Sequence, residues 1–263
     1  MSFPNNSLSL GILVLSCDKY EDIWRPFFHC LERYWPDRPF PCYLVTNHQR
    51  PEFPGVSIIA VGDDRTWSDN VLKALEQVGE DYVLMFIEDL LLHAPVDATR
   101  LERILTWVAT ERPPYVQLVR SESPDGPHSD LVGVVLPGTL YRTSTVISVW
   151  RKDVLKGILT SGESAWDFEL TGSARSDAFG VFYRSWTDCF KVTNCIIKGV
   201  WYPPALKQMR ALGVPISTTP ARRAMSIREF LVFQAVILRS KVFKLFPRKL
   251  RRRIRLEILK RGR

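Results

Sequence analysis

Hydrophobic positions in the first 110 residues form continuous apolar runs separated by amphipathic stretches. The apolar runs at residues 8–17, 41–46, 56–61 and 82–87 predict strands that are buried on both faces. Amphipathic stretches at about 22–34, 69–78 and 98–110 predict the helices between them. This alternation predicts an α/β fold with a mainly parallel sheet, whose ligand site lies where the strands end.

Beyond residue 110 the pattern changes to shorter elements. Short strands are expected at 115–119, 138–141 and 146–150, short helices at 152–160 and 165–174, and a strand of alternating character at 190–200. Prolines at 215–220 indicate a linker. We therefore expect one α/β domain over residues 1–214 and a basic helical tail over residues 215–263.

The charge is concentrated in that tail. The chain has a net charge of +8, but residues 222–263 contain 15 Lys and Arg against 2 Asp and Glu, so the rest is slightly acidic. Residues 226–246 and 247–263 mix these cations with apolar side chains, which favours binding to an anionic membrane surface. A helix packed on the domain with a solvated basic face is the plain alternative. Nucleic-acid binding is not expected, because the apolar content is high.

Two further features of the composition indicate the compartment. The five cysteines have no disulfide-framework or zinc spacing, which favours a reducing environment, and Cys17 and Cys42 lie in apolar runs as small hydrophobes. No run of about 18 apolar residues and no signal-peptide pattern is found, so we expect a soluble or peripheral protein.

An acidic pair, Glu88 and Asp89, directly follows the fourth predicted strand. Ligands of α/β proteins bind at this position, and carboxylate oxygens suit Mg²⁺ or Mn²⁺, which commonly bridges diphosphate oxygens. A helix cap or a solvated turn is the alternative interpretation. The pair is the strongest single indication of a site in the first half of the chain.

As an ordered set, several segments resemble bacterial GT-A-type glycosyltransferases of cell-surface polysaccharide synthesis. They are ILVLSCDKYEDIW, RYWPDRPFPCYLVTN, VGDDRTWSDN, DYVLMFIEDLLL and SAWDFEL, which span roughly residues 11–200. The resemblance implies a single GT-A-like (Rossmann-like) domain, a nucleotide-sugar donor, and a glycan or lipid-linked acceptor at the cytoplasmic face of the membrane. Glu88 and Asp89 occupy the acidic-motif position without the full Asp-x-Asp pattern. Both a Mg²⁺- or Mn²⁺-dependent reaction and a metal-independent one therefore stay open.

In that class the first strand and its loop hold the nucleotide, so donor-binding residues are expected at the neighbouring strand ends. A capping or core role is the alternative for each of them, and a helix start also favours anions. The expected donor-binding residues are Ser16, Asp18, Tyr20, Thr46, Asn47, Trp67, Ser68, Asp69, Asn70, Glu88 and Asp89, with Lys198 at the diphosphate.

The resemblance also implies that a carboxylate from a later loop acts as the general base. Inverting sugar transfer needs such a group to take the proton of the acceptor hydroxyl. We assign Glu169 to this role, with Asp167 as second choice and Trp166 as an acceptor-stacking residue. An ordinary helix start capped near Asp167 is the alternative. Arg175 and Arg184 are further candidates for the phosphates.

Two other functions are considered. A sugar nucleotidyltransferase would share the fold, but such enzymes usually carry a Gly-rich basic first loop, which SCDKYEDIW lacks. A non-catalytic membrane- or RNA-binding module would make the acidic pairs structural. The sequence has no GxGxxG or P-loop pattern, so dinucleotide redox chemistry and P-loop ATP hydrolysis have no support.

Overall fold

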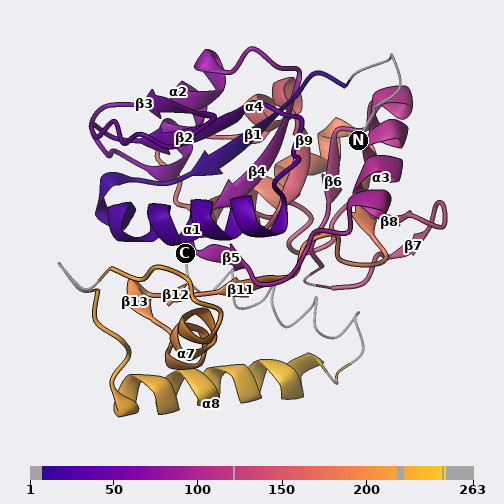
Figure 1. Ribbon diagram of the computed structural model, residues 1–263. Helices are drawn as coiled ribbons and strands as arrows, with labels where there is room; N and C mark the ends of the chain where they lie inside the picture. The colour runs from indigo at the N-terminus through magenta and orange to yellow at the C-terminus, as the bar shows by residue number, and fades with distance from the viewer. Residues whose placement is uncertain (1–7, 121, 218–221, 245, 247–263) are drawn as a thin grey trace.

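A computed structural model of the chain describes residues 8–120, 122–217, 222–244 and 246. Its centre is a nine-stranded sheet in the order β3-β2-β1-β4-β9-β6-β10-β8-β7 (Figure 1). Strands β1 (Leu10–Leu15), β2 (Cys42–Thr46), β3 (Val56–Ala60) and β4 (Tyr82–Ile87) are parallel neighbours. This confirms the expected α/β fold with a large, mostly parallel sheet.

The second half of the sheet is mixed. β9 (Ser148–Arg151) runs antiparallel to β4 and to β6 (Tyr115–Gln117). β10 (Phe182–Ser185) is parallel to β6, and the edge consists of β8 (Val132–Val135) and β7 (Gly126–Pro127). Because β9 is antiparallel to β4, the residues that precede β9 lie at the same edge as the residues that follow β4.

Helices cover both faces of the sheet. The side chains of β1 alternate between two hydrophobic cores, one on each face of the sheet. Leu10, Ile12 and Val14 pack in the first core, and Leu13 and Leu15 pack in the second. The first core contains side chains of α1 (Glu21–Tyr34), α3 (Ala98–Glu111) and α7 (Pro203–Ala211). The second core contains side chains of α2 (Trp67–Gln77) and α4 (Lys152–Ile158). Fully apolar strands follow directly from this two-sided burial.

Smaller elements complete the chain. A helical stretch runs through α5 (Ala165–Asp167), the π-helical η2 (Phe168–Gly172), α6 (Ser173–Arg175) and the 3₁₀ turn η3 (Ser176–Phe179), and another 3₁₀ turn, η1 (Asp18–Tyr20), precedes α1. Two small sheets pair β5 (Leu90–Leu92) with β11 (Val192–Asn194), and β12 (Ile196–Ile197) with β13 (Val200–Trp201). Helix α8 (Ile227–Lys244) lies at the bottom of Figure 1.

Two predicted strands are wrong. Residues 138–141 form a turn, because Gly138 and Tyr141 have φ values of 70° and 55°, which no strand accommodates. Residues 190–200 are not one strand, since Lys198 and Gly199 have φ values of 51° and 77° and form the turn of the β12–β13 hairpin. The sequence analysis also missed β8, β10 and α7. The predicted helix at 247–263 and most of the linker at 215–220 lie outside the described residues.

A fully buried arginine joins the loops of the second half. Arg142 donates hydrogen bonds to the carbonyl oxygens of Val135, Ser176 and Gly180 at 3.2, 2.6 and 2.5 Å. Its guanidinium lies 4.1 Å from the ring centroid of Phe182. The loop before β9 and the helical stretch that ends at 179 are therefore held together by one side chain.

Arg142→Met is expected to lower the free energy of unfolding by about 3–5 kcal/mol, because it leaves several buried acceptors without a donor. Arg103→Met is the matched control, since Arg103 is an exposed arginine paired with the exposed Asp130. That change should cost less than about 1 kcal/mol. Urea denaturation of both variants measures the difference, and equal midpoints would contradict the assigned role.

Candidate active site

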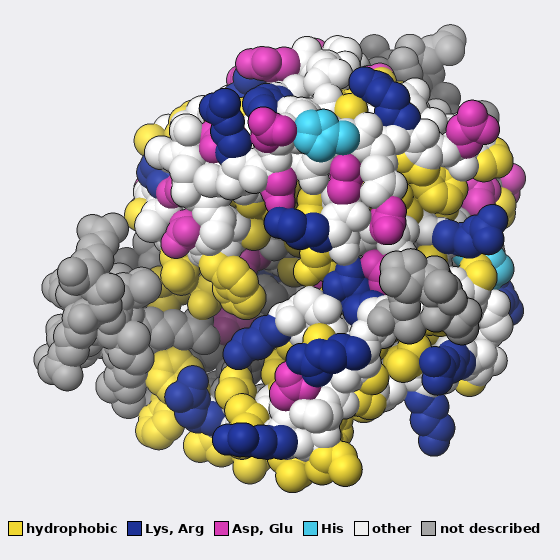
Figure 2. Space-filling view, turned by 90° about the vertical axis from the view of Figure 1, so that its left-hand side faces the viewer, with side chains coloured by type: hydrophobic (Ala, Val, Ile, Leu, Met, Phe, Trp, Pro, Cys, Tyr) yellow, Lys and Arg dark blue, Asp and Glu magenta, His cyan; other side chains and the backbone are white. Residues whose placement is uncertain are grey.

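Strands β1 and β4 end side by side. Leu15 pairs with Ile87 in the parallel register, so the residues that follow each strand emerge at the same edge of the sheet. A cavity of about 270 Å³ opens there. We call it the edge cavity; its lining is Leu15, Ser16, Cys17, Tyr20, Val45, Asp64, Trp67, Asn70, Val71, Ile87, Glu88, Asp89 and Ala165. In Figure 1 strands β1 and β4 point to the left-hand side of the molecule. Figure 2 shows the molecule from that side, and its surface there is hollowed.

The carboxylates of Glu88 and Asp89 are the dominant charges of the edge cavity. Burial raises the pKa of Glu88 well above its usual range, and the neighbouring Asp89 raises it further. Burial also raises the pKa of Asp89 to about 6, partly offset by its own backbone amide and by the positive charge of Arg222. Within the described part of the chain neither carboxylate forms a salt bridge. A buried carboxylate next to a partly buried one attracts a cation or a hydrogen-bond donor.

The rest of the lining combines apolar walls with a few polar groups. Asn70 donates from Nδ2 to Asp64 at 2.9 Å, and Lys19 donates to the same carboxylate at 3.1 Å. Ser16 accepts a hydrogen bond from Trp24 Nε1 at 2.7 Å. Apolar walls with few polar groups are typical of small-molecule and cofactor sites.

Asp18, Thr46 and Asn47 fix the loops around the edge cavity and are not among its lining residues. The Asp18 carboxylate accepts from the backbone amides of Asn47, His48 and Gln49 at 2.9, 3.0 and 3.2 Å. Asn47 Oδ1 accepts from the Asp18 amide, and Thr46 donates to the Gln49 carbonyl. The loops that follow β1 and β2 are thereby joined into one rigid unit.

The start of α2 contributes to the cavity wall and also joins it to a distant loop. Ser68 is buried and exchanges hydrogen bonds with Glu163, from its amide to the Glu163 carbonyl and from the Glu163 amide to its Oγ. Trp67 packs on Phe168 with ring centroids 5.1 Å apart. Asp69 points elsewhere: its carboxylate accepts from Thr66, and hydrogen bonds from Ser161 and Thr66 lower its pKa. The structure therefore brings Trp67 and Asn70 to the cavity and leaves Asp69 outside its lining.

Glu169 lies one helical turn beyond a lining residue of the edge cavity. Ala165 lines the cavity, and Glu169 follows it by four residues in the same helical stretch, although Glu169 is not itself a lining residue. Its carboxylate accepts from the Thr145 amide at 2.7 Å and from the hydroxyls of Thr145 and Ser144 at 2.9 and 3.1 Å. All three contacts use one oxygen, Oε1. The turn is π-helical, a geometry that is frequent at functional sites.

The neighbours of Glu169 have different surroundings. Asp167 forms a capping box with Ser164, and the hydrogen bonds from the Ser164 hydroxyl and amide lower its pKa. Asp167 therefore caps the start of the helical stretch, whereas Glu169 is held by the loop that precedes β9. Trp166 is 72% exposed and presents an unusually open aromatic ring beside the cavity residue Ala165.

The three cations expected to bind the phosphates, Lys198, Arg175 and Arg184, have different surroundings. Lys198 is exposed in the β12–β13 turn, beside Gly199, whose carbonyl accepts from Arg222 at 2.8 Å. Arg175 forms a salt bridge with Glu163 at 2.6 Å. Arg184 is buried and donates to Gln117 at 2.5 Å. Among the three, only Lys198 lies on a turn that is linked to the cavity residue Tyr20, through Arg222.

Besides the apolar lining, three residues at or next to the edge cavity were not predicted from the sequence. Cys17, expected to be buried in a strand, lies in the loop after β1 and lines the edge cavity; Cys42 is buried as expected. Asp64 could have been recognised, because the VGDDRTWSDN segment contains it. Arg222 was counted only as the first cation of the basic tail. No local pattern indicates its position, since its main partner Asp22 lies 200 residues away.

The acidic pair suits a divalent cation only in part. Glu88 and Asp89 supply hard oxygen ligands that fit Mg²⁺ or Mn²⁺, and no salt bridge with another described residue competes for them. In the part of the chain that the structure describes, no group of three or more His, Cys, Asp or Glu side chains converges on one point. An ion held by this pair would therefore take its remaining ligands from phosphate oxygens and water.

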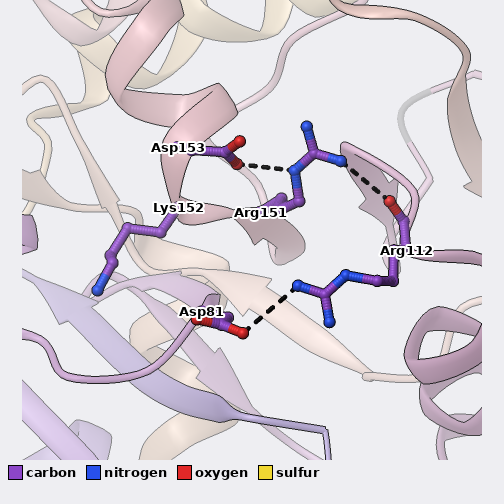
Figure 3. A pocket seen from close by; sticks show the side chains of 5 residues that line it. All are labelled: Asp81, Arg112, Arg151, Lys152 and Asp153. Atoms are coloured by element: carbon purple, nitrogen blue, oxygen red, sulfur yellow. Dashed lines mark hydrogen bonds and ion pairs between the residues drawn. The ribbon is translucent and has the colours of Figure 1, made fainter.

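A second cavity, of about 350 Å³, lies at the opposite edge of the sheet (Figure 3). The charged side chains that line it form ion pairs and hydrogen bonds with other groups of the protein. Arg112 pairs with Asp81 and Arg151 with Asp153, at 3.4 and 2.7 Å, and Lys152 donates to the Val78 carbonyl. The amino ends of β4 and β6 border this cavity, whereas α/β proteins bind ligands at the carboxyl ends, so the edge cavity is the stronger candidate.

Comparison with known proteins shows the fold of the chain. No family model matches it, and no curated protein matches it in sequence. TarS residues 1–349 from S. aureus, in complex with UDP, are 11% identical with a TM-score of 0.51; the match covers 78% of this chain and 64% of that one. UTP-bound UGPase from Acinetobacter baumannii is 12% identical with a TM-score of 0.51, and the match covers 88% of this chain and 99% of that one. A UDP-glucose pyrophosphorylase complexed with UDP-glucose is 8% identical with a TM-score of 0.53, over 79% and 99%. The likeness confirms a GT-A or Rossmann-like fold.

Asp89→Asn is expected to raise the stability of the ligand-free protein at neutral pH. The folded-state pKa of about 6 lies above the ordinary value of 3.8, so the ionised group destabilises the fold as the pH rises through this interval. A pKa difference of about 2 corresponds to at most roughly 3 kcal/mol. The gain should be complete above pH 7 and absent below pH 4. Urea denaturation between pH 4 and 8 measures it, with the exposed Glu76→Gln on α2 as control. A gain that is independent of pH would contradict the assignment.

Proposed function

We propose that the protein is a glycosyltransferase that moves a sugar from a nucleotide-sugar donor to a glycan or lipid-linked acceptor. The observation that carries the proposal is the pairing of two features at one sheet edge. The carboxylates of Glu88 and Asp89, which form no salt bridge with another described residue, face a cavity with apolar walls, and Glu169 follows the lining residue Ala165 by four residues. The first feature suits a nucleoside diphosphate with or without a cation, and the second supplies a base.

The proposed reaction is an inverting displacement. The acceptor oxygen bonds to the anomeric carbon while its proton passes to the Glu169 carboxylate. The bond from the anomeric carbon to the phosphate oxygen breaks, and the nucleoside diphosphate leaves with the electron pair. A cation bound by Glu88 and Asp89 would stabilise that leaving charge; in a metal-independent reaction Lys198 and nearby backbone amides would do so. Ser144 and Thr145 hold Glu169 through Oε1, which leaves Oε2 for the proton.

The structural likeness supports the donor class. TarS, a glycosyltransferase, is described with UDP, and the pyrophosphorylases are described with UTP or UDP-glucose. Each of these ligands is a uridine nucleotide or its sugar conjugate. This chain covers 64% of the TarS fragment, so the acceptor is inferred from the residues of this chain and not from that protein.

A sugar nucleotidyltransferase is the second candidate, because the matches cover 99% of both pyrophosphorylase chains. The loop after β1 disfavours it. In place of a Gly-rich basic loop, Ser16 to Tyr20 form a short turn and a 3₁₀ helix that Asp18 holds against the loop after β2. Release of pyrophosphate from a nucleoside triphosphate and a sugar 1-phosphate would identify this activity. Release of a nucleoside diphosphate from a nucleotide-sugar would identify a glycosyltransferase.

A thermal-shift screen against UDP-, GDP-, CMP- and dTDP-linked sugars, with and without Mn²⁺, tests the donor site directly. A ligand at about 100 times its Kd stabilises the folded state by roughly 2.7 kcal/mol, which is readily seen. We expect a selective shift that Asp89→Ala removes if a cation is required. The absence of a shift with every donor would favour a non-catalytic membrane- or RNA-binding module, and salt-sensitive RNA binding would identify the latter.

Glu169→Gln is expected to reduce sugar transfer at least 10³-fold and to leave the Kd of the donor within about threefold, because it removes the base and keeps the shape. Asp167→Asn is the matched control on the same helical turn. It should weaken the capping box, costing about 1 kcal/mol of stability, and keep most of the activity. Rates are measured by nucleoside diphosphate release. Loss of activity in Asp167→Asn alone would move the base to that residue.

We also propose that α8 attaches the protein to an anionic membrane surface. The body-facing side of α8 packs through Phe230 and Phe233 on Tyr202, with ring centroids 6.0 and 5.5 Å apart. The outer side of α8 exposes Arg228 and Arg239 among apolar side chains. The exposed apolar side chains are Ile227, Leu231, Val232, Val236, Leu238 and Val242. Figure 2 shows hydrophobic side chains with Lys and Arg among them along the lower margin. A helix that is apolar on both sides needs a second surface to cover it. No helix among the described residues is long and apolar enough to cross a membrane.

The double variant Leu231→Gln, Leu238→Gln is expected to weaken binding to vesicles that contain 30% phosphatidylglycerol by at least tenfold. Both side chains are more than 60% exposed and lie seven residues apart on one face of α8. The double variant Leu136→Gln, Val181→Gln removes exposed apolar side chains at the far edge of the sheet and serves as control. Vesicle co-sedimentation measures the binding, and equal loss in both variants would contradict a docking role for α8.

A further inference from the structure

Arg222 connects the C-terminal segment with the wall of the edge cavity. Its Nε and Nη2 atoms donate to the two oxygens of Asp22 at 2.9 and 2.7 Å. Nη2 also donates to the Lys19 carbonyl, and Nη1 to the Gly199 carbonyl, both at 2.8 Å. One side chain therefore joins the start of α1, the η1 turn and the β12–β13 turn.

The same guanidinium lies over Tyr20, a lining residue of the edge cavity. Its central carbon is 4.5 Å from the ring centroid, a cation–π distance. The side chains of Arg222 and Asp22 are only 12% and 13% exposed, so the contact is largely desolvated. A paired, desolvated arginine of this kind orders the groups around it more strongly than a surface ion pair does.

The chain that carries Arg222 is itself held on the protein body. The Trp201 amide donates to the Arg223 carbonyl and the Met225 amide donates to the Trp201 carbonyl, both at 3.0 Å, so residues 223–225 pair with β13 in a parallel bridge. Arg223 then pairs with Glu229 at 2.7 Å and fixes the start of α8. The position of Arg222 is therefore determined by packed structure on its C-terminal side.

Arg222 is also a source of positive charge for the acidic pair. Its field acts on both Glu88 and Asp89 and opposes the rise in their pKa values. Most of its N–H groups are already used by Asp22, Lys19 and Gly199, so it is suited to hold the site in place and poorly suited to bind a ligand directly.

We propose that Arg222 is a positioning residue of the donor site: by fastening Tyr20, η1 and the Lys198–Gly199 turn, it sets the affinity of the edge cavity for a nucleoside diphosphate. The inference rests on the proposed use of a nucleotide-sugar and adds a residue that the C-terminal segment contributes. The segment that leads into α8 is then part of the donor site as well as a link to the membrane helix.

Arg222→Gln tests the proposal. Isothermal titration with UDP, GDP, dTDP and CMP first identifies the nucleotide that the wild-type chain binds. For that nucleotide we expect at least a tenfold rise in Kd in Arg222→Gln, and a matching rise in donor KM with kcat changed less than threefold. Arg223→Gln, the adjacent residue with an equivalent ion pair, is the control and should leave the Kd within twofold.

A double-mutant cycle separates positioning from a general loss of stability. Asp22→Asn should raise the Kd as Arg222→Gln does, and the double variant should raise it no further, because both changes break the same contact. Arg222→Lys keeps the charge and loses the bidentate contact; it provides a second measurement if Arg222→Gln does not fold, and should also raise the Kd at least tenfold.

The outcomes distinguish the two proposals. If the wild-type chain binds none of these nucleotides, the proposed function and this inference both fail. If it binds one, and both Arg222 variants that fold bind it as tightly as Arg223→Gln does, only the positioning role fails. A lowered melting temperature with an unchanged Kd would make the Arg222 contact purely structural.

Discussion

A buried carboxylate, Glu88, and a partly buried one, Asp89, lie next to each other at the end of β4, and the candidate site is organised around this unfavourable arrangement. Glu88 and Asp89 cannot both be ionised in a desolvated position without a nearby positive charge or a donor. The parallel register of β1 and β4 places them opposite the loop after β1, and the rigid contacts of Asp18 prevent that loop from collapsing onto them. The fold thus maintains an open cavity next to a charge pair that a bound cation or ligand would stabilise.

The remaining elements are joined to this edge by long-range polar contacts. Ser68 links α2 to Glu163, and Ser144 and Thr145 hold Glu169. Arg142 anchors the same loops from the far side. Because β9 runs antiparallel to β4, a loop distant in sequence reaches the edge where the parallel strands end. The mixed half of the sheet therefore contributes the candidate base, and the parallel half contributes the candidate donor cavity.

Sequence patterns predicted the parallel half well, because each strand there is buried on both faces and reads as an uninterrupted apolar run. They also singled out Glu88 and Asp89, because this acidic pair directly follows the apolar run of β4, while Glu169 was chosen through the family resemblance. The prediction of strands failed where the backbone conformation decides between strand and turn. Gly138, Tyr141 and Lys198 have positive φ values, so the chain forms turns at these positions. It also missed Arg222, because a contact between residues 200 positions apart leaves no local periodicity.

The contact between Tyr20 and Arg222 can form only late in the synthesis of the chain. The η1 turn, α1 and the acidic pair leave the ribosome early. Arg222, which fastens η1 and the start of α1, is translated 200 residues after Asp22. A nascent chain that has already formed β1 to β4 therefore holds Glu88 and Asp89 without this counter-charge. In such a chain the protonated form of the pair has the lower free energy. The cavity therefore reaches its final electrostatic character only when the segment that carries Arg222 has docked.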